Sequence, residues 1–190
     1  DKLVIAVDTE TSSLNPQEAE LIGISISYAT NASFYIPLGH KNTKGLKKNL
    51  VLYKLKIILE CACIKKVCQN TKYDFIIFKN HGIELNPVED TMLLSYTLDA
   101  GNNRHNMDTL SEIHLGHKTI SYKDLVGTGK KQLNFTEIDL KSATEYAAED
   151  ADVTLRLYNI LSERVLEEKL EKIYEIFEKP MIKILSKLET

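Results

Sequence analysis

Near its N-terminal end the sequence reads Leu3-Val4-Ile5-Ala6-Val7-Asp8-Thr9-Glu10. Five apolar residues in succession predict a strand that is buried on both faces, as in the middle of a sheet covered by helices. Two carboxylates separated by one residue follow, and strand alternation sends both side chains to the same side. We expect a central strand that ends in an acidic pair suited to bind Mg2+ or Mn2+. A solvated acidic turn explains this pattern equally well.

The segments around that strand predict an α/β domain. Alternating residues over 21–28 and 33–37 predict two more strands, which form an antiparallel meander with the first. Lys66-Val67-Cys68 predicts a fourth strand after an amphipathic helix over 47–61. Helical spacing dominates the rest of the chain, with helices predicted over 73–80, 90–98, 107–115, 139 to beyond 161, and 169–189 with an interruption near Pro180.

Composition narrows the class of protein. The 190 residues suffice for one domain, and 43% hydrophobic and 27% charged residues are typical of a globular protein. No apolar run has the length of a membrane span and no signal peptide is evident, so we expect a cytoplasmic protein with no membrane partner. The three cysteines are expected to be core or surface thiols. The net charge of −3 lacks the excess of basic residues that is typical of nucleic-acid-binding domains. Cations bound by carboxylates would reverse the local charge and still allow such a protein to bind nucleic acid.

Two further acidic segments have ordinary explanations when each is taken alone. Asp74 lies in Gln69-Asn70-Thr71-Lys72-Tyr73-Asp74, where a strand passes into a helix, and it could simply cap that helix. Tyr146 and Asp150 are four residues apart, so they share one face of a helix. A surface stripe would give the same spacing.

Five segments together resemble the proofreading 3′-5′ exonuclease domain of bacterial family A DNA polymerases, the DNA polymerase I group, in the DEDD exonuclease superfamily. The resemblance spans nearly the whole chain and implies a ribonuclease H-like fold. That fold is a mixed five-stranded sheet, a three-strand antiparallel meander plus parallel strands, flanked by helices. The segments are Val7-Asp8-Thr9-Glu10-Thr11, Gln69-Asn70-Thr71-Lys72-Tyr73-Asp74, Asp90-Thr91-Met92-Leu93-Leu94-Ser95-Tyr96, Arg104-His105-Asn106-Met107-Asp108 and Tyr146-Ala147-Ala148-Glu149-Asp150-Ala151-Asp152-Val153-Thr154.

The resemblance implies a catalytic set of four metal ligands and a tyrosine: Asp8, Glu10, Asp74, Asp150 and Tyr146. Tyr146 would orient the attacking water, because a tyrosine with a pKa of about 10 is a poor base at neutral pH. Two divalent ions, Mg2+ or Mn2+, with Zn2+ as an alternative at the nucleophile-side site, would stabilise the attacking and leaving oxygens. The expected product is a nucleoside 5′-monophosphate.

The resemblance also implies the substrate contacts. It places Leu14 as a wedge and Tyr122 as an aromatic platform near the terminal bases, with Asn70 and Arg104 near the DNA. For Leu14 and Tyr122, packing in the core is an equally good interpretation.

The expected organisation is an exonuclease domain over residues 1–168 and a C-terminal helix over 169–190 that leads into a covalently linked polymerase domain. The chain would then be a monomeric fragment that removes nucleotides from the 3′ end of single-stranded DNA. Two alternatives stay open from the sequence. One is an RNA 3′-end exonuclease of the ribonuclease D kind, and the other is a catalytically silent exonuclease-like scaffold.

Overall fold

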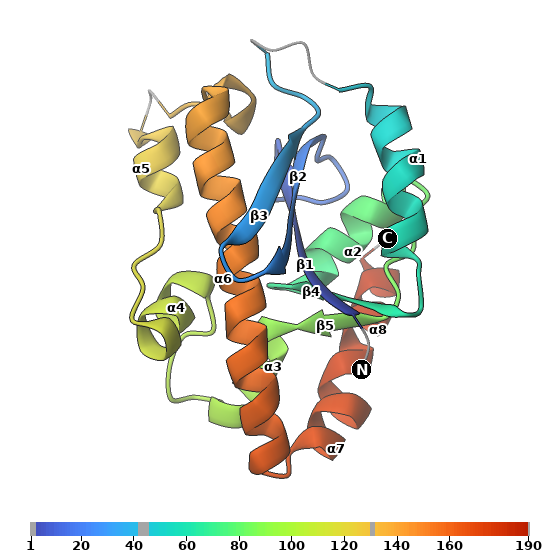
Figure 1. Cartoon of the computed structure of the whole chain (residues 1–190), viewed down its shortest axis with the longest axis vertical. Coiled ribbons are helices and arrows are strands. Elements are labelled where there is room, and N and C mark those ends of the chain that lie inside the picture. Colours follow the sequence, from blue (N-terminus) through green and yellow to red (C-terminus); the bar gives the residue numbers. More distant parts are fainter. Residues whose placement is uncertain (1–2, 42–45, 130–131, 190) are drawn as a thin grey trace.

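A five-stranded mixed sheet forms the centre of the computed structural model, which describes residues 3–41, 46–129 and 132–189 (Figure 1). The strand order is β3-β2-β1-β4-β5. β1, β2 and β3 form an antiparallel meander, whereas β4 runs parallel to β1 and β5 parallel to β4. The predicted sheet is therefore confirmed, with β1 at its centre. The strands are β1 (Leu3–Thr11), β2 (Leu21–Ala29), β3 (Ala32–Pro37), β4 (Ile64–Cys68) and β5 (Val88–Asp90).

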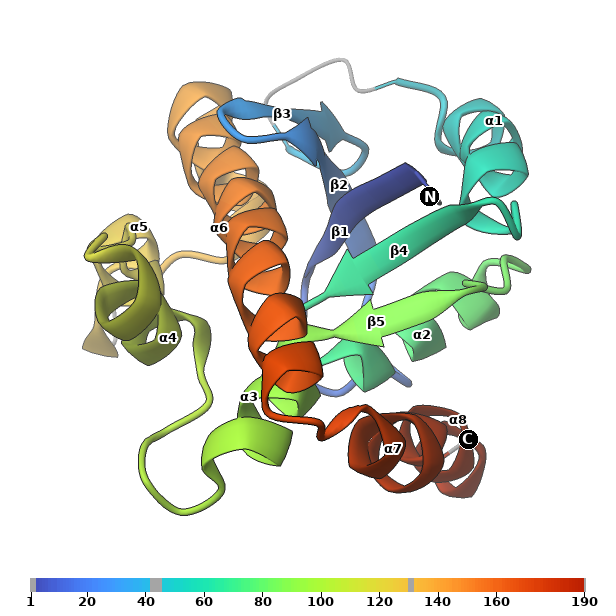
Figure 2. The same ribbon diagram turned by 60° about the horizontal axis from the view of Figure 1, so that its bottom comes forward.

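Helices cover both faces of the sheet (Figure 2). The long helix α6 contacts β1, β2 and β3 on one face, and α2 contacts β1, β4 and β5 from the other. The C-terminal helix α8 packs on α2. The helices are α1 (Lys48–Leu59), α2 (Thr71–Asn80), α3 (Thr91–Asp99), α4 (Met107–Leu115), α5 (Tyr122–Val126), the 3-10 helix η2 (Phe135–Glu137), α6 (Leu140–Glu167), α7 (Glu171–Ile173), the π-helix η3 (Tyr174–Glu178) and α8 (Lys179–Leu188).

Small residues let α6 lie close to the sheet. Ala143, Ala147 and Ala151 follow each other at intervals of four along this helix and are fully buried. A side chain longer than alanine at these places would hold the helix away from β2 and β3, at a typical cost of about 1–3 kcal/mol. This close packing brings the polar residues of α6 to the end of β1.

Several boundaries differ from the sequence expectations. The C-terminal helical segment changes to a π-helix at Tyr174–Glu178, before Pro180. Pro180 itself lies in the first turn of α8, where its missing N–H removes no helical hydrogen bond. Neither α5 nor η2 was expected, because helices of five and three residues carry too little periodicity to be recognised.

The cysteines agree only in part with the sequence expectation. Cys61 and Cys63 pair as a disulfide, so the expectation of thiols is wrong for these two residues, while Cys68 is a buried free thiol. None of the helices in the described part of the chain is long and apolar enough to cross a membrane.

Candidate active site

The carboxyl end of β1 carries the first two candidate ligands. β4 pairs with β1 only as far as Ala6, whereas β2 continues alongside, with Ser25 opposite Asp8 and Gly23 opposite Glu10. Residues directly opposite each other on neighbouring strands share a face of the sheet. Ser25 is small and buried, and the Tyr35 ring fills the space that a side chain at position 23 would need, so Tyr35 packs beside the Glu10 end of β1.

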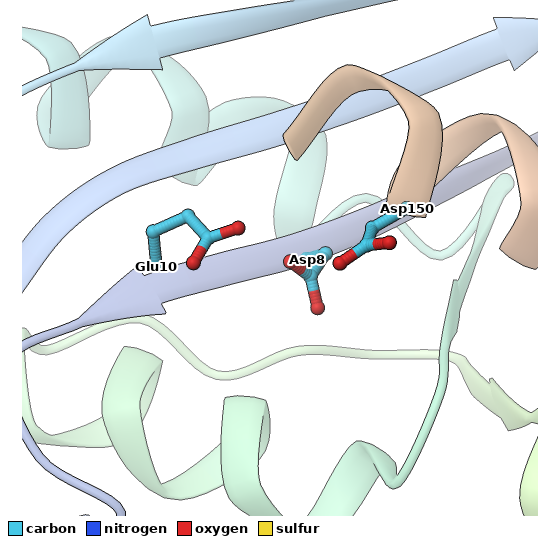
Figure 3. A group of neighbouring side chains, drawn as sticks. All are labelled: Asp8, Glu10 and Asp150. Atoms are coloured by element: carbon cyan, nitrogen blue, oxygen red, sulfur yellow. The ribbon is translucent and has the colours of Figure 1, made fainter. Parts of the chain in front are cut away.

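Helix α6 brings the third carboxylate to this place. Figure 3 shows Asp150 reaching from α6 toward Asp8 and Glu10 of β1, and one oxygen of each residue lies within 4.8 Å of the others. Glu10 and Asp150 are only 7% and 8% exposed. The structure thus contradicts both a solvated acidic turn at β1 and a surface stripe at Asp150.

Asp74 is held separately, by hydrogen bonds from β1. Its Oδ1 accepts from the backbone N of Thr9 at 3.1 Å and from Thr9 Oγ1 at 2.6 Å. Helix α2 begins at Thr71 with Asn70 as its N-cap residue, so the interpretation of Asp74 as a helix cap is wrong. The structure brings three of the four predicted carboxylates into one cluster and places the fourth beside it, in the same cleft.

This cleft has a volume of about 360 Å3. Leu14 is 96% exposed and Tyr122 43% exposed, so packing in the core is the wrong interpretation for both. Arg104 is exposed on the connection between α3 and α4 and is not among the described residues that line the cleft. The lining residues are Asp8, Thr9, Glu10, Thr11, Ser12, Ser13, Leu14, Gln69, Asn70, Tyr73, Asp74, Tyr122, Tyr146 and Asp150.

Two residues that we did not predict as functional fix the walls of the cleft. The Tyr73 hydroxyl donates to the carbonyl of Ser13 at 2.6 Å, which holds the turn that presents Leu14. The buried Asp90 carboxylate accepts from the backbone N–H groups of Asn70 and Thr71 at 3.2 and 2.8 Å. Both residues lie inside the quoted motif segments, but spacing alone does not reveal hydrogen bonds between distant segments.

Burial dominates the electrostatics of the carboxylates. It raises the pKa of Asp8 from 3.8 to about 6, against the opposing effect of a hydrogen bond from the Thr9 backbone. It also raises the pKa of Glu10, Asp74 and Asp150 well above their usual range, and the charge of Asp8 adds to each of these increases. Several acidic groups thus share a poorly solvated space, where a cation would relieve their mutual repulsion.

The donor set fits a hard divalent cation. Glu10 Oε1 is buried and has no hydrogen-bond partner among the described residues, which is unfavourable unless a ligand binds it. Carboxylate oxygens without nitrogen or sulfur donors are typical of Mg2+, Mn2+ and Ca2+ sites.

Tyr146 stays protonated at neutral pH. Burial raises its pKa above the usual value of 10, and the nearby negative charges of Asp150 and Glu10 raise it further. The ring is fixed by aromatic neighbours, with its centroid 6.0 Å from that of Tyr122 and 6.2 Å from that of Phe135. Its hydroxyl therefore keeps its proton, which it donates to the Asp150 carboxylate.

Comparison with known sequences identifies close relatives. A family model described as 3′-5′ exonuclease matches residues 1–166. DNA polymerase I of Rhizobium leguminosarum is 44% identical over 206 residues, which cover 98% of this chain and 20% of that protein. DNA polymerase I of Borreliella burgdorferi is 40% identical over 186 residues, 97% of this chain and 20% of that protein. The chain thus spans about a fifth of the length of these relatives.

Solved structures share the fold at lower sequence identity. Brucella melitensis NrnC with bound Mg2+ superposes with a TM-score of 0.72 at 22% identity, covering 99% of this chain and 84% of that one. Escherichia coli RNase D superposes with a TM-score of 0.66 at 18% identity, and the match covers 97% of this chain and 45% of that one. These similarities confirm the expected ribonuclease H-like fold.

Proposed function

The chain belongs to the 3′-5′ exonuclease family found in bacterial DNA polymerase I, and we propose that it removes nucleotides from single-stranded 3′ ends of DNA as a proofreading activity. The observation that carries this proposal is the convergence of Asp8, Glu10 and Asp150 within 4.8 Å in an open cleft. Such a cluster is costly for the fold, so its presence is best explained by a ligand that it binds.

We propose that Asp8, Glu10, Asp74 and Asp150 hold two divalent ions. When bound, the ions supply the charge that activates a water molecule and stabilises both oxygens of the displacement. Mg2+ and Mn2+ suit the oxygen-only donor set better than Zn2+, which favours nitrogen and sulfur ligands. The hydrogen bonds from Thr9 orient Asp74, so Thr9 supports the proposed metal site without binding the ions itself.

The remaining cleft residues hold the substrate and the water. The Tyr146 hydroxyl, which donates its proton to Asp150, accepts a hydrogen bond from the attacking water and so orients it toward the terminal phosphorus. Leu14 and Tyr122 stand exposed at the rim, where a leucine can wedge between bases and a tyrosine can stack on one without reading sequence. The water oxygen bonds to the phosphorus as the bond to the 3′ oxygen of the preceding nucleotide breaks, so the terminal nucleotide leaves with its 5′ phosphate and the shortened strand takes up a proton to end in a 3′ hydroxyl.

We also propose the limits of the domain and its surroundings, with the same comparisons as support. The family model ends at residue 166 and α6 ends at Glu167, which supports an exonuclease domain over residues 1–168. Residues 169–190 would then lead toward a polymerase domain in a protein of the relatives' length. A cytoplasmic location and DNA as the partner are proposed on the same ground.

RNA is the second candidate substrate, because RNase D shares the fold. A cleft that accepts RNA must accommodate the 2′-hydroxyl group, so the two substrates can be distinguished directly. A silent scaffold is disfavoured, since the chain retains all four carboxylates and clusters three of them.

The test compares matched oligonucleotides. Single-stranded DNA, duplex DNA with a paired or mismatched 3′ end, and RNA of the same sequence are incubated with the protein and Mg2+ or Mn2+. The proposal predicts shortening from the 3′ end, fastest on single-stranded and mismatched DNA. Faster digestion of the RNA would favour the ribonuclease alternative, and no metal-dependent digestion of any substrate would favour the scaffold.

A further inference from the structure

The connection between α4 and α5, residues 116–121, leads directly to the proposed base platform and has no regular secondary structure. Tyr122 follows it directly as the first residue of α5. Figure 1 shows α5 as a separate short helix beside the N-terminal part of α6. α5 has five residues, and Ser121, its N-cap residue, makes no side-chain capping hydrogen bond. Helices of this length are unstable by themselves, so other contacts must fix the position of Tyr122.

Three sets of hydrogen bonds tie this connection to its neighbours. Ser111 Oγ on α4 donates to the carbonyl of His117 at 2.8 Å. Thr119 Oγ1 donates to Asp108 Oδ1 at 2.7 Å. The third set reaches α6, where both carboxylate oxygens of Glu149 are engaged by the connection.

Glu149 makes the most direct link to the platform. Its Oε1 lies 2.8 Å from His117 Nε2, and its Oε2 accepts from the backbone N–H of Ile120 at 2.6 Å. Ile120 is only two residues before Tyr122. The Glu149 side chain is 19% exposed, and hydrogen bonds to a partly buried carboxylate are stronger than those between neutral groups.

The position of Glu149 in α6 relates this link to the cleft. Its neighbour Asp150 points toward β1, whereas Glu149 points toward the connection and does not line the cleft. One turn earlier on α6, the ring of Tyr146 contacts that of Tyr122. One helix thus holds a metal-ligand candidate, the water-orienting tyrosine and the anchor of the platform.

We propose that Glu149 is a positioning residue that sets the place of Tyr122 over Tyr146, and thereby the grip on the terminal base of the substrate. The grip on the substrate rests on the proposed function, whereas the positioning of Tyr122 by Glu149 does not. Glu149 is not among the described residues that line the cleft, so its loss should weaken substrate capture more than chemistry.

The test has a structural and a kinetic part. Amide hydrogen exchange over residues 117–126 is compared in wild type, Glu149→Ala, Glu149→Gln and the control Glu145→Ala. Glu145 lies on the same helix with a 60% exposed side chain and pairs only loosely, at 3.9 Å, with Lys141. We expect faster exchange in this segment for Glu149→Ala, partial recovery in Glu149→Gln, which keeps one acceptor oxygen, and no change for the control.

The kinetic part is a double-mutant cycle with Tyr122→Ala on single-stranded DNA. We expect Glu149→Ala to raise KM about five- to tenfold, in line with the loss of one base–aromatic stacking contact, with kcat changed much less. In the Tyr122→Ala background the same substitution should add little, because its effect passes through Tyr122.

Unchanged exchange in Glu149→Ala, or effects that simply add in the double mutant, would overturn the inference. A fall in kcat alone would also overturn it, since that would assign Glu149 to the chemistry. If the wild type digests no DNA, the proposed function fails, and hydrogen exchange still decides whether Glu149 holds the segment.

Discussion

Replacing Asp8 with asparagine should stabilise the protein when no divalent metal is bound. Burial raises the pKa of Asp8 from 3.8 to about 6, so the folded state disfavours the charged carboxylate. At about 1.4 kcal/mol per pKa unit, the ionised group lowers the free energy of unfolding by about 3 kcal/mol at pH 7. The neutral amide has a similar shape and avoids this penalty.

The pH dependence has a defined sign. Between the unfolded pKa near 3.8 and the folded pKa near 6, the folded protein binds more protons than the unfolded chain. Stability of the metal-free wild type therefore falls as pH rises through this window and the penalty is complete above it. Below pH 3.8 the difference between wild type and Asp8→Asn should vanish. Removing the Asp8 charge also lowers the raised pKa of Glu10 and Asp150, which adds to the effect at neutral pH.

The assay is thermal or urea unfolding in EDTA at pH 4.5 and pH 7.5, with Mn2+ added in parallel samples. For a domain of this size, 3 kcal/mol corresponds to about 6–12 °C in Tm. We expect Asp8→Asn to unfold at the higher temperature in EDTA at pH 7.5, and Mn2+ to stabilise wild type much more than the variant. An Asp8→Asn protein that is less stable than wild type in EDTA at pH 7.5 would show that the buried Asp8 charge does not destabilise the metal-free fold.

Three substitutions, two of them with a comparison variant, test other parts of the structure. Tyr146→Phe should lower kcat about 100-fold with little change in KM, because a misplaced water reacts slowly. Tyr122→Phe keeps an aromatic platform and should retain most activity. Steady-state kinetics distinguishes the two variants. Leu14→Ala should raise KM for single-stranded DNA about three- to tenfold. The free energy of unfolding should change by less than about 0.5 kcal/mol, since the side chain is almost fully exposed. An unchanged KM would show that Leu14 does not bind the substrate. Asp90→Ala should lower the free energy of unfolding, measured by urea titration, by about 3 kcal/mol. It removes the acceptor of backbone N–H groups at the starts of α2 and α3. Asp124→Ala, at an exposed position, is the control.

The sequence predicted the central strand because its apolar residues form one continuous run before Asp8. The four-residue interval between Tyr146 and Asp150 likewise predicted their common helix face. These features depend on local periodicity, which is visible in a single sequence. The convergence of the carboxylates was expected from the resemblance, and the cluster of Asp8, Glu10 and Asp150 agrees with it.

Features that depend on long-range contacts could not be predicted from local patterns. The bond between Thr9 and Asp74 joins residues 65 apart in the chain, and a helix cap was the simpler interpretation of Asp74. The short helix α5 leaves no periodic signal, and its place depends on side chains of α4 and α6. The π-helix at Tyr174–Glu178 coincides with a buried contact, in which the Tyr174 hydroxyl donates to Glu89 Oε2 at 2.9 Å. Spacing within the segment does not encode that contact.

A metal-dependent reaction at the clustered carboxylates is tested by digestion of 5′-labelled single-stranded DNA with wild type and Asp150→Asn, in Mg2+ or in EDTA. Glu145→Gln is the control. The structure places Asp150 in the acidic cluster and Glu145 on the exposed face of the same helix. We predict a ladder that shortens from the 3′ end, release of nucleoside 5′-monophosphates only with the metal, full activity in Glu145→Gln and a loss of at least about 100-fold in Asp150→Asn. Equal digestion in EDTA, or by Asp150→Asn, would contradict a metal-dependent reaction at these carboxylates.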